Sequence, residues 1–393
     1  MSKKAGVFVF FFCLCKFAFC ESQALQTYKQ NFSSADLPVK VNVLNAAAAD
    51  RNASEFIGPL YDYALQFALR NYELLNNDPD MINLTAVTVT GLRTTGYTES
   101  VNDLWKLFSI YQVSDTGAEI LLSLGQLGRG NRRIINNLNN FLTEQNEYFF
   151  SGMYVDYVLV SACIAALLQL GDSSSYPVLF RVMCAGFPEV LAFEALGAME
   201  LIPGNYRQFL CDIIRENSPE EKFAAFKAGV YSERFDPAEC GQIAELALEQ
   251  SLIFSGGDEE NIHLTSMRYA AVSALIPLRW TRANDLAVRH YYRVHADYQN
   301  GNVSKDRYIE SISLLGSAGN SGAALILVLQ LGFINAETGR KYSYDPEITL
   351  ETVRALGLIG DKAAYDILLS IKNLPYSDNI KAAAREAIDR LKW

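Results

Sequence analysis

One short sequence occurs twice in this chain, and it constrains the fold more than any other feature. Residues 166–172 read Ala-Leu-Leu-Gln-Leu-Gly-Asp, and residues 355–361 read Ala-Leu-Gly-Leu-Ile-Gly-Asp. The similarity continues past the aspartate, because apolar residues follow at matching offsets in both copies. An apolar helix that ends at a glycine and is followed directly by a second apolar helix predicts a packed helical hairpin. A hairpin that recurs along a chain indicates a repeat architecture, in which each unit packs on its neighbours.

Further turns of the same kind occur along the chain. Helical periodicity dominates from about residue 37 to residue 392, and strict alternation of apolar and polar residues is nearly absent. The glycines that mark the turns are Gly96, Gly128, Gly171, Gly204, Gly319 and Gly360. The pattern weakens between the fourth and the fifth of these, but two more hairpins are expected there. The sequence therefore predicts an all-α protein of about eight helical hairpins.

The regions outside the regular hairpins have distinct compositions. Residues 37–77 are rich in Tyr and Phe and are expected to form an N-terminal cap, preceded by a polar lead at 21–36. Residues 376–393 mix charged and apolar residues, which is typical of a cap helix with one face in water. Long loops are expected at 255–260 and 335–346, and such insertions often carry binding residues.

The hairpins resemble HEAT repeats, in particular the short bacterial HEAT-like type marked by Ala-Leu-x-x-Leu-Gly-Asp. Residues 166–180 and 355–369 match this pattern closely, residues 123–135 and 313–328 match it fairly, and the resemblance extends over most of 37–393. It implies a right-handed, armadillo-like α-solenoid that binds other proteins along a concave surface lined by the second helices. The family shares no catalytic residue, so the resemblance implies no active site.

The first twenty residues are expected to be a signal peptide. Lys3 and Lys4 precede an apolar run from Val7 to Cys15, and Ala18-Phe19-Cys20 forms a cleavage site before Glu21. The run is much shorter than the roughly 20 residues that a membrane-spanning helix needs, so we expect no transmembrane segment in the mature chain. The expected location is the periplasm of a bacterium. A lipid anchor on Cys20 is the alternative.

The charge balance restricts the class of partner. The chain has a formal net charge of −10 at pH 7, and removal of the lysines in the first twenty residues makes the mature chain more acidic. Binding to nucleic acid depends on clustered Lys and Arg that displace counterions from phosphates. We therefore expect no nucleic-acid partner.

The sequence contains none of the usual catalytic or metal-binding motifs. Its three histidines are His263, His290 and His295, and neither HExxH, GxSxG nor a phosphate-binding loop occurs. We expect a protein that is not an enzyme and that needs neither a cofactor nor a metal. The rival interpretation is an (α/α) toroid that acts on carbohydrate. Such an enzyme needs two carboxylates across a cleft, and most turns here are too short to carry them.

Four cysteines follow the first twenty residues, at Cys163, Cys184, Cys211 and Cys240. Apolar helical surroundings favour buried thiols. Cys163 and Cys184 also lie at nearly equal distances from the turn that begins at Gly171, so an antiparallel hairpin would bring them level. Because export permits oxidation, this pair is a candidate disulfide.

One helix combines aromatic and basic residues in a way that is typical of protein interfaces. It follows Trp280, it is expected to be the second helix of its hairpin, and its candidate binding residues are Arg289, His290, Tyr291, Tyr292, Arg293, His295 and Tyr298. Tyr, Trp and Arg are the residues that most often anchor interfaces. The alternative is that some of these aromatic rings pack in the core. The expected partner is a protein or a peptide, and its identity and the oligomeric state stay open.

Overall fold

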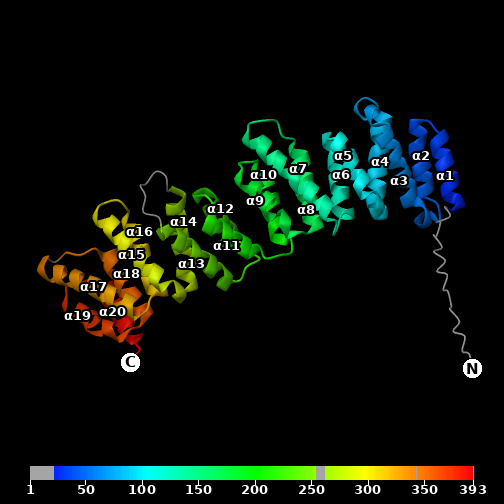
Figure 1. The fold of residues 1–393 in the computed structure, drawn as a ribbon. Coiled ribbons are helices and arrows are strands. Elements are labelled where there is room, and N and C mark those ends of the chain that lie inside the picture. The colour runs from blue at the N-terminus through cyan, green and yellow to red at the C-terminus, as the bar shows by residue number, and fades with distance from the viewer. Residues whose placement is uncertain (1–21, 254–261, 342, 393) are drawn as a thin grey trace, which may run out of the picture. The chain divides into compact units, whose positions relative to one another are not determined.

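The computed structural model describes residues 22–253, 262–341 and 343–392. Over these residues the chain forms twenty α-helices joined by short turns and 3-10 helices, without a β-strand (Figure 1). The predicted signal peptide, with Cys20, and the predicted loop at 255–260 lie outside the described residues. The chain divides into two compact units, and each is treated separately. The first comprises the residues up to Val178 and Pro188–Ala198, and the second comprises Leu179–Phe187 and the residues from Met199 onward.

In the first unit the helices form two layers. Its helices are α1 (Gln23–Ser34), α2 (Leu37–Ala48), α3 (Ile57–Arg70), α4 (Pro79–Thr95), α5 (Val101–Ile110), α6 (Ser114–Leu127), α7 (Arg132–Phe150), α8 (Tyr157–Leu170) and most of α10 (Glu189–Leu201). Helices α2, α4, α6 and α8 pack each on the next, and α1, α3, α5 and α7 follow one another in the second layer. This alternation is the packing expected of stacked hairpins.

The second unit repeats the arrangement. Its helices are most of α9 (Tyr176–Cys184), α11 (Tyr206–Glu216), α12 (Pro219–Val230), α13 (Pro237–Ile253), α14 (Ile262–Leu278), α15 (Asn284–Gln299), α16 (Lys305–Ala318), α17 (Ser321–Lys341), α18 (Pro346–Ile359), α19 (Tyr365–Ser370) and α20 (Asp378–Asp389). Helices α12, α14, α16, α18 and α20 pack each on the next. Within each unit the helices stack on their neighbours as expected of helical hairpins, so the prediction of an all-α solenoid is confirmed.

The repeated Gly-Asp has a specific role in the backbone. Gly171 and Gly360 end α8 and α18 in the left-handed conformation, with φ of 68° and 72°, which glycine adopts without steric cost. The carboxylates of Asp172 and Asp361 each accept a hydrogen bond of 2.9 Å from the backbone N–H two residues ahead. The motif is therefore the end of one helix joined directly to the capped start of the next.

Small residues allow the first helices to approach closely. A Cβ added to Gly125 in α6 would lie 2.6 Å from the Cα of Ala166 in α8, and one added to Gly316 in α16 would lie 2.7 Å from the Cα of Ala355 in α18. The same contact recurs between Gly357 in α18 and Ala387 in α20. In each contact the glycine lies at the third position of its repeat's motif. It packs on the alanine at the first position of the motif in the following repeat.

The N-terminal lead differs from the sequence-based expectation. Most of the predicted polar lead at 21–36 is helix α1, which packs on α2 and α3. Leu25 and Phe32 are buried, and the ring of Phe32 meets the rings of Tyr63 and Phe67 edge-on, with centroids 5.9 and 5.7 Å apart. Two apolar residues seven positions apart lie on the same helix face. Because the other residues of this segment are mostly polar, the composition of the segment did not indicate a packed helix.

Helix α17 differs from expectation in its length. The predicted loop at 335–346 is helical as far as Lys341, and α18 begins at Pro346. By length and composition alone, α17 could also cross a membrane, and among the described helices it is the one that meets both criteria. It packs on α16, α18 and α19, and a helix in a protein core meets the same criteria. Length and composition are therefore weak evidence for a membrane segment.

Candidate binding groove

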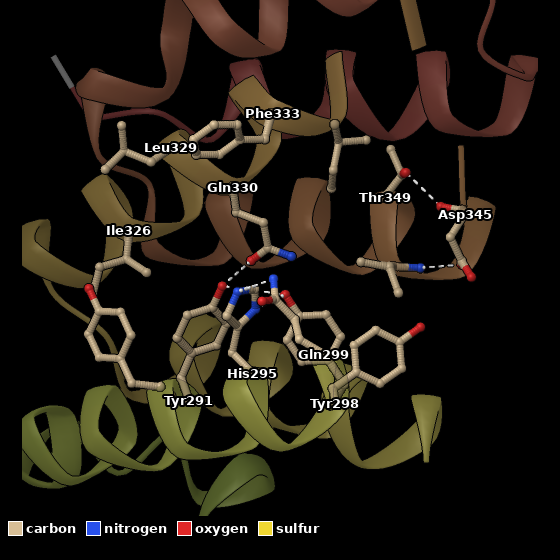
Figure 2. A pocket seen from close by; sticks show the side chains of 14 residues that line it. Tyr291, His295, Tyr298, Gln299, Ile326, Leu329, Gln330, Phe333, Asp345 and Thr349 are labelled. Atoms are coloured by element: carbon tan, nitrogen blue, oxygen red, sulfur yellow. Dashed lines mark hydrogen bonds between the residues drawn. The ribbon is translucent and has the colours of Figure 1, made fainter. Parts of the chain in front are cut away.

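The second unit contains an open groove between the second helices α15 and α17, with the start of α18 at one end (Figure 2). Its volume of about 540 Å³ lies in the range of pockets that hold small ligands or anchoring side chains. Fourteen residues line it, namely Tyr291, Tyr292, His295, Tyr298, Gln299, Tyr308, Ile326, Leu329, Gln330, Phe333, Ile334, Asp345, Ile348 and Thr349. Apolar and aromatic side chains predominate, and one residue carries a formal charge.

Aromatic rings from α15 and α16 form the floor of the groove. Tyr291, His295 and Tyr298 lie at positions i, i+4 and i+7 of α15, so they share one helix face. Tyr308 of α16 lies beneath them, and its ring stacks on the ring of Tyr298 with centroids 4.7 Å apart. Tyr291 and Tyr308 are buried, so the floor is fixed by packing.

The opposite wall comes from α17 and is unusually exposed. Leu325, Leu329 and Phe333 lie at positions i, i+4 and i+8, with 53%, 66% and 75% of their surface accessible. Leu329 and Phe333 face the groove (Figure 2). Contiguous apolar surface of this kind is uncommon on proteins that bind nothing and marks interaction sites.

A continuous series of hydrogen bonds crosses the floor. The Gln299 Nε2 lies 3.0 Å from His295 Nε2, and His295 Nδ1 lies 2.9 Å from the Tyr308 hydroxyl. The Tyr291 hydroxyl is 3.5 Å from that of Tyr308 and donates a 2.7 Å hydrogen bond to Gln330 Oε1. If Gln299 donates to His295 Nε2, the imidazole is neutral and its proton is on Nδ1, directed to Tyr308.

The series continues into α18. Gln330 Nε2 donates to the Thr352 hydroxyl over 3.3 Å, and that hydroxyl donates to the carbonyl of Ile348 over 2.8 Å. At the groove wall, the Thr349 hydroxyl donates to the carbonyl of Asp345 over 2.6 Å. This series occupies hydrogen-bonding groups of Tyr291, His295, Tyr308 and Gln330, and it does not include the hydroxyls of Tyr292 and Tyr298.

The floor is uncharged near neutral pH. Burial raises the pKa of Tyr291 and of Tyr308 above the ordinary value for a phenol, which keeps both hydroxyls protonated. Burial also lowers the pKa of His295, which favours the neutral imidazole required by its hydrogen bonds. No ionised group therefore stands beneath a bound molecule.

Charge is concentrated at the α18 end of the groove. Asp345 caps α18, because its Oδ1 accepts from the backbone N–H groups of Glu347 and Ile348 at 3.0 and 3.1 Å. The Lys305 ammonium lies 3.6 Å from Asp345 Oδ2 and also pairs with the Glu347 carboxylate. Two carboxylates share one cation there, so this end carries surplus negative charge.

The structure divides the predicted binding residues of α15 between two faces. Tyr291, Tyr292, His295 and Tyr298 line the groove, with Tyr291 in its floor. His290 points the other way and is fully buried, with its ring edge-on to Tyr269 at a centroid distance of 5.8 Å. Neither of its ring nitrogens has a hydrogen-bond partner among the described residues.

The remaining predicted residues lie outside the groove. Arg289 is exposed, and the charge of Arg293 adds to the effect of burial in lowering the pKa of the His290 imidazole. The Trp280 ring packs on Gly241 of α13, where an added Cβ would lie 2.6 Å from it. Its indole N–H donates to Glu245 Oε2 over 2.7 Å. Trp280 therefore has a role in packing α13, and the structure does not bring it to the groove.

The candidate disulfide between Cys163 and Cys184 is not formed in this structure. Cys163 and Cys184 are both free thiols in this structure. The Cys163 sulfur is fully buried and lies 3.6 Å from the carbonyl oxygen of Leu138 in α7. The spacing argument placed both cysteines at the same level, but it could not show which way the Cys163 side chain points.

Within the part of the chain that the structure describes, no group of three or more His, Cys, Asp or Glu side chains is arranged to hold a metal ion. The four cysteines lie apart from the groove, since none of them lines it.

The α17 wall was missed in the sequence. Residues 323–334 form one almost continuous apolar run, which reads as a helix buried on all sides. The structure buries Ala324, Leu327 and Leu331 and exposes Leu325, Leu329 and Phe333. The sequence does contain one signal of this wall, because the run has more apolar residues than one helix face can hold. That signal does not show which face of the helix lacks a packing partner.

Comparisons with known proteins give likenesses to solved structures alone. No protein-family model matches the chain, and no curated protein matches it. Among solved structures, a similar chain comes from the work titled "A conserved phosphorylation switch controls the interaction between cadherin and beta-catenin in vitro and in vivo". The two chains are 12% identical, 94% of each is covered, and the TM-score is 0.29. No functional conclusion follows from a likeness at this level. Its own helices define this chain as an all-α repeat protein of the solenoid type.

Proposed function

We propose that this protein is a non-catalytic scaffold that binds a partner protein or peptide through the groove between α15 and α17. The observation that carries the proposal is the exposed apolar face of α17 beside an aromatic floor. Phe333 keeps 75% of its surface accessible although it borders a cavity of about 540 Å³. Burying such a side chain contributes roughly 1.5–3 kcal/mol, which a partner would supply.

The chemistry of the groove favours binding over catalysis. A glycoside hydrolase requires two carboxylates on either side of the substrate bond. Asp345 is the one carboxylate in the lining, and it is engaged in capping α18 and in contact with Lys305. His295 contacts Tyr308 and Gln299, so it is not paired with a nucleophile or with a carboxylate that would orient it as a base.

A crosslinking pulldown from the native source tests the proposal. Tyr292→Ala and Phe333→Ser remove exposed side chains of the two walls, and both positions are accessible enough for the fold to tolerate the change. Tyr231→Ala, which removes an exposed tyrosine outside the groove, is the control. We expect the two groove variants to lose a protein that the wild type and the control retain. Recovery of the same proteins by all four would refute the assignment.

The cellular location belongs to the same proposal. Lys3, Lys4 and the apolar run up to Cys15 support export by a bacterium, and the scaffold would then act in the envelope. Mass spectrometry of the mature N-terminus decides between the two forms. A free Glu21 would establish cleavage after Cys20, a diacylated Cys20 would establish a lipid anchor, and an intact Met1 would refute export.

A further inference from the structure

We propose that the occupant of this groove is an amphipathic α-helix of the partner, with uncharged apolar anchors against α17 and a basic residue at the Asp345 end. This inference rests on the proposed function and specifies the class of partner. Three features of the groove support this inference. They are the hydrogen bonds available to a peptide backbone, the spacing of the exposed side chains of α17, and the distribution of charge.

The hydrogen bonds of the floor argue against an extended peptide. An extended chain presents unpaired backbone N–H and C=O groups at every residue, and each costs free energy if it is buried without a partner. Tyr308 is hydrogen-bonded to His295 and to Tyr291. Gln330 is hydrogen-bonded to Tyr291 and to Thr352. The described residues also contain no β-strand whose edge could pair with a peptide. A helix satisfies its own backbone groups, so it can be buried here without that cost.

The spacing of the α17 wall matches a second helix. Leu329 and Phe333, which line the groove, continue a ridge from the exposed Leu325, which is not a lining residue, with about 6 Å between neighbours along the axis. Helices pack by setting such ridges into the grooves between ridges of another helix. On the faces turned toward its neighbours in the structure, α17 buries other residues, among them Leu327 and Leu331. The exposed ridge is the one helix-packing surface of α17 that lacks a partner in the described chain.

The charge distribution orients the occupant. Asp345 and Glu347 share the single cation Lys305 at the α18 end of the groove, and Glu347 is 61% accessible. A Lys or Arg on the partner helix would neutralise this surplus charge. The uncharged floor excludes ionised anchors elsewhere, because a buried charge without a partner is costly.

Selection from a displayed library of random 16-residue peptides tests the inference directly. The bait is the full mature chain, and binders retained by Phe333→Ser are discarded. We expect enriched peptides to carry Leu, Phe, Trp or Met at i, i+4 and i+7, and Lys or Arg near one end. Circular dichroism of the enriched peptides should show helix gained on binding. Enrichment of extended or acidic sequences, or no enrichment, would overturn the inference.

Binding of an enriched peptide to variants gives the second test. Phe333→Ser should weaken binding by about tenfold or more, as expected of a central anchor. Glu347→Gln should weaken a Lys-bearing peptide by about two- to fivefold and leave a Lys→Gln version of that peptide unaffected. Leu201→Ser, at an exposed leucine of α10 outside the groove, is the control and should have no effect. Equal loss in the control, or no charge dependence, would contradict the assignment.

A lipid surface is the remaining occupant to exclude. Vesicles of neutral phosphatidylcholine should not retain the protein in a flotation assay. Retention that Phe333→Ser abolishes would assign the α17 ridge to membrane and overturn the helix proposal. If the pulldown recovers a groove-dependent protein but the library yields no helical binder, the proposed function stands and this inference fails.

Discussion

Acidification from about pH 7.5 to about pH 5.5 should destabilise the second unit by roughly 1.4 kcal/mol through His290 alone. Burial, and then the positive charges of Arg268, Arg293 and Arg307, lower the pKa of this imidazole from 6.5 to about 3. The folded state therefore keeps His290 neutral at both pH values. The unfolded chain takes up a proton near pH 6.5, so lower pH favours unfolding.

The magnitude follows from the two pKa values. Because the unfolded state binds more protons below pH 6.5, the stabilisation is complete above that pH and decreases as the pH falls toward about 3. At about pH 5.5 the loss is close to RT ln 11, or about 1.4 kcal/mol, and any native pKa below about 4.5 gives the same result. Carboxylates contribute little here, since their unfolded pKa values lie near 4.

The assay compares wild type with His290→Leu. Urea titrations are followed by hydrogen exchange of peptides from α14 to α16, which isolates unfolding of this part of the chain. Wild type should lose at least about 1.4 kcal/mol between the two pH values, because the lowered pKa of His295 acts in the same direction, and the variant should lose at least 1 kcal/mol less than wild type. Leucine has a similar size and no titrating group. An equal pH dependence in both proteins would refute the reasoning, and so would a wild type that is insensitive to pH.

Three further predictions concern packing and thiols. Gly316→Ala should destabilise by about 1–3 kcal/mol in urea unfolding, because its Cβ would lie 2.7 Å from a backbone atom, whereas Gly197→Ala meets no atom within 4 Å and should stabilise by about 0.5–1 kcal/mol. Equal effects would contradict the close approach. Arg268→Met should raise stability by about 1–4 kcal/mol in thermal melting, since the guanidinium is buried with its Nε unpartnered; destabilisation would show that the charge is compensated. Without reductant, Cys163 of the folded protein should resist labelling by maleimide, because the thiol is buried and its pKa is raised. Cys184 should be labelled after unfolding. If neither Cys163 nor Cys184 is labelled in the unfolded chain, the two form a disulfide.

The fold was accessible from the sequence because local rules specify it. A left-handed glycine followed by a capping aspartate joins one helix to the next at Gly171 and at Gly360, whereas the predicted turns at Gly128 and Gly319 have negative φ. Helix α1 was missed because its two buried residues, Leu25 and Phe32, are diluted by polar neighbours. Their burial depends on α2 and α3, which local sequence does not report.

The groove was only half predictable. Tyr292 and Tyr298 could be chosen because aromatic residues on a second helix are typical of interfaces. Phe333 could not, because within an apolar run an exposed side chain and a buried one look the same. Sequence also could not divide α15 into faces, so the buried His290 was grouped with residues that face the groove.

The close contact of Gly125 with Ala166, and of Gly316 with Ala355, has a consequence for how such a protein can change. At these contacts between first helices, a single added methyl group would meet the backbone of the neighbouring helix. Substitutions there are therefore restricted to the smallest side chains. Leu329 and Phe333 on the second layer meet solvent, and their replacement costs the fold little. New binding specificities could therefore arise on the second helices, while the first helices hold the spacing of the repeats constant.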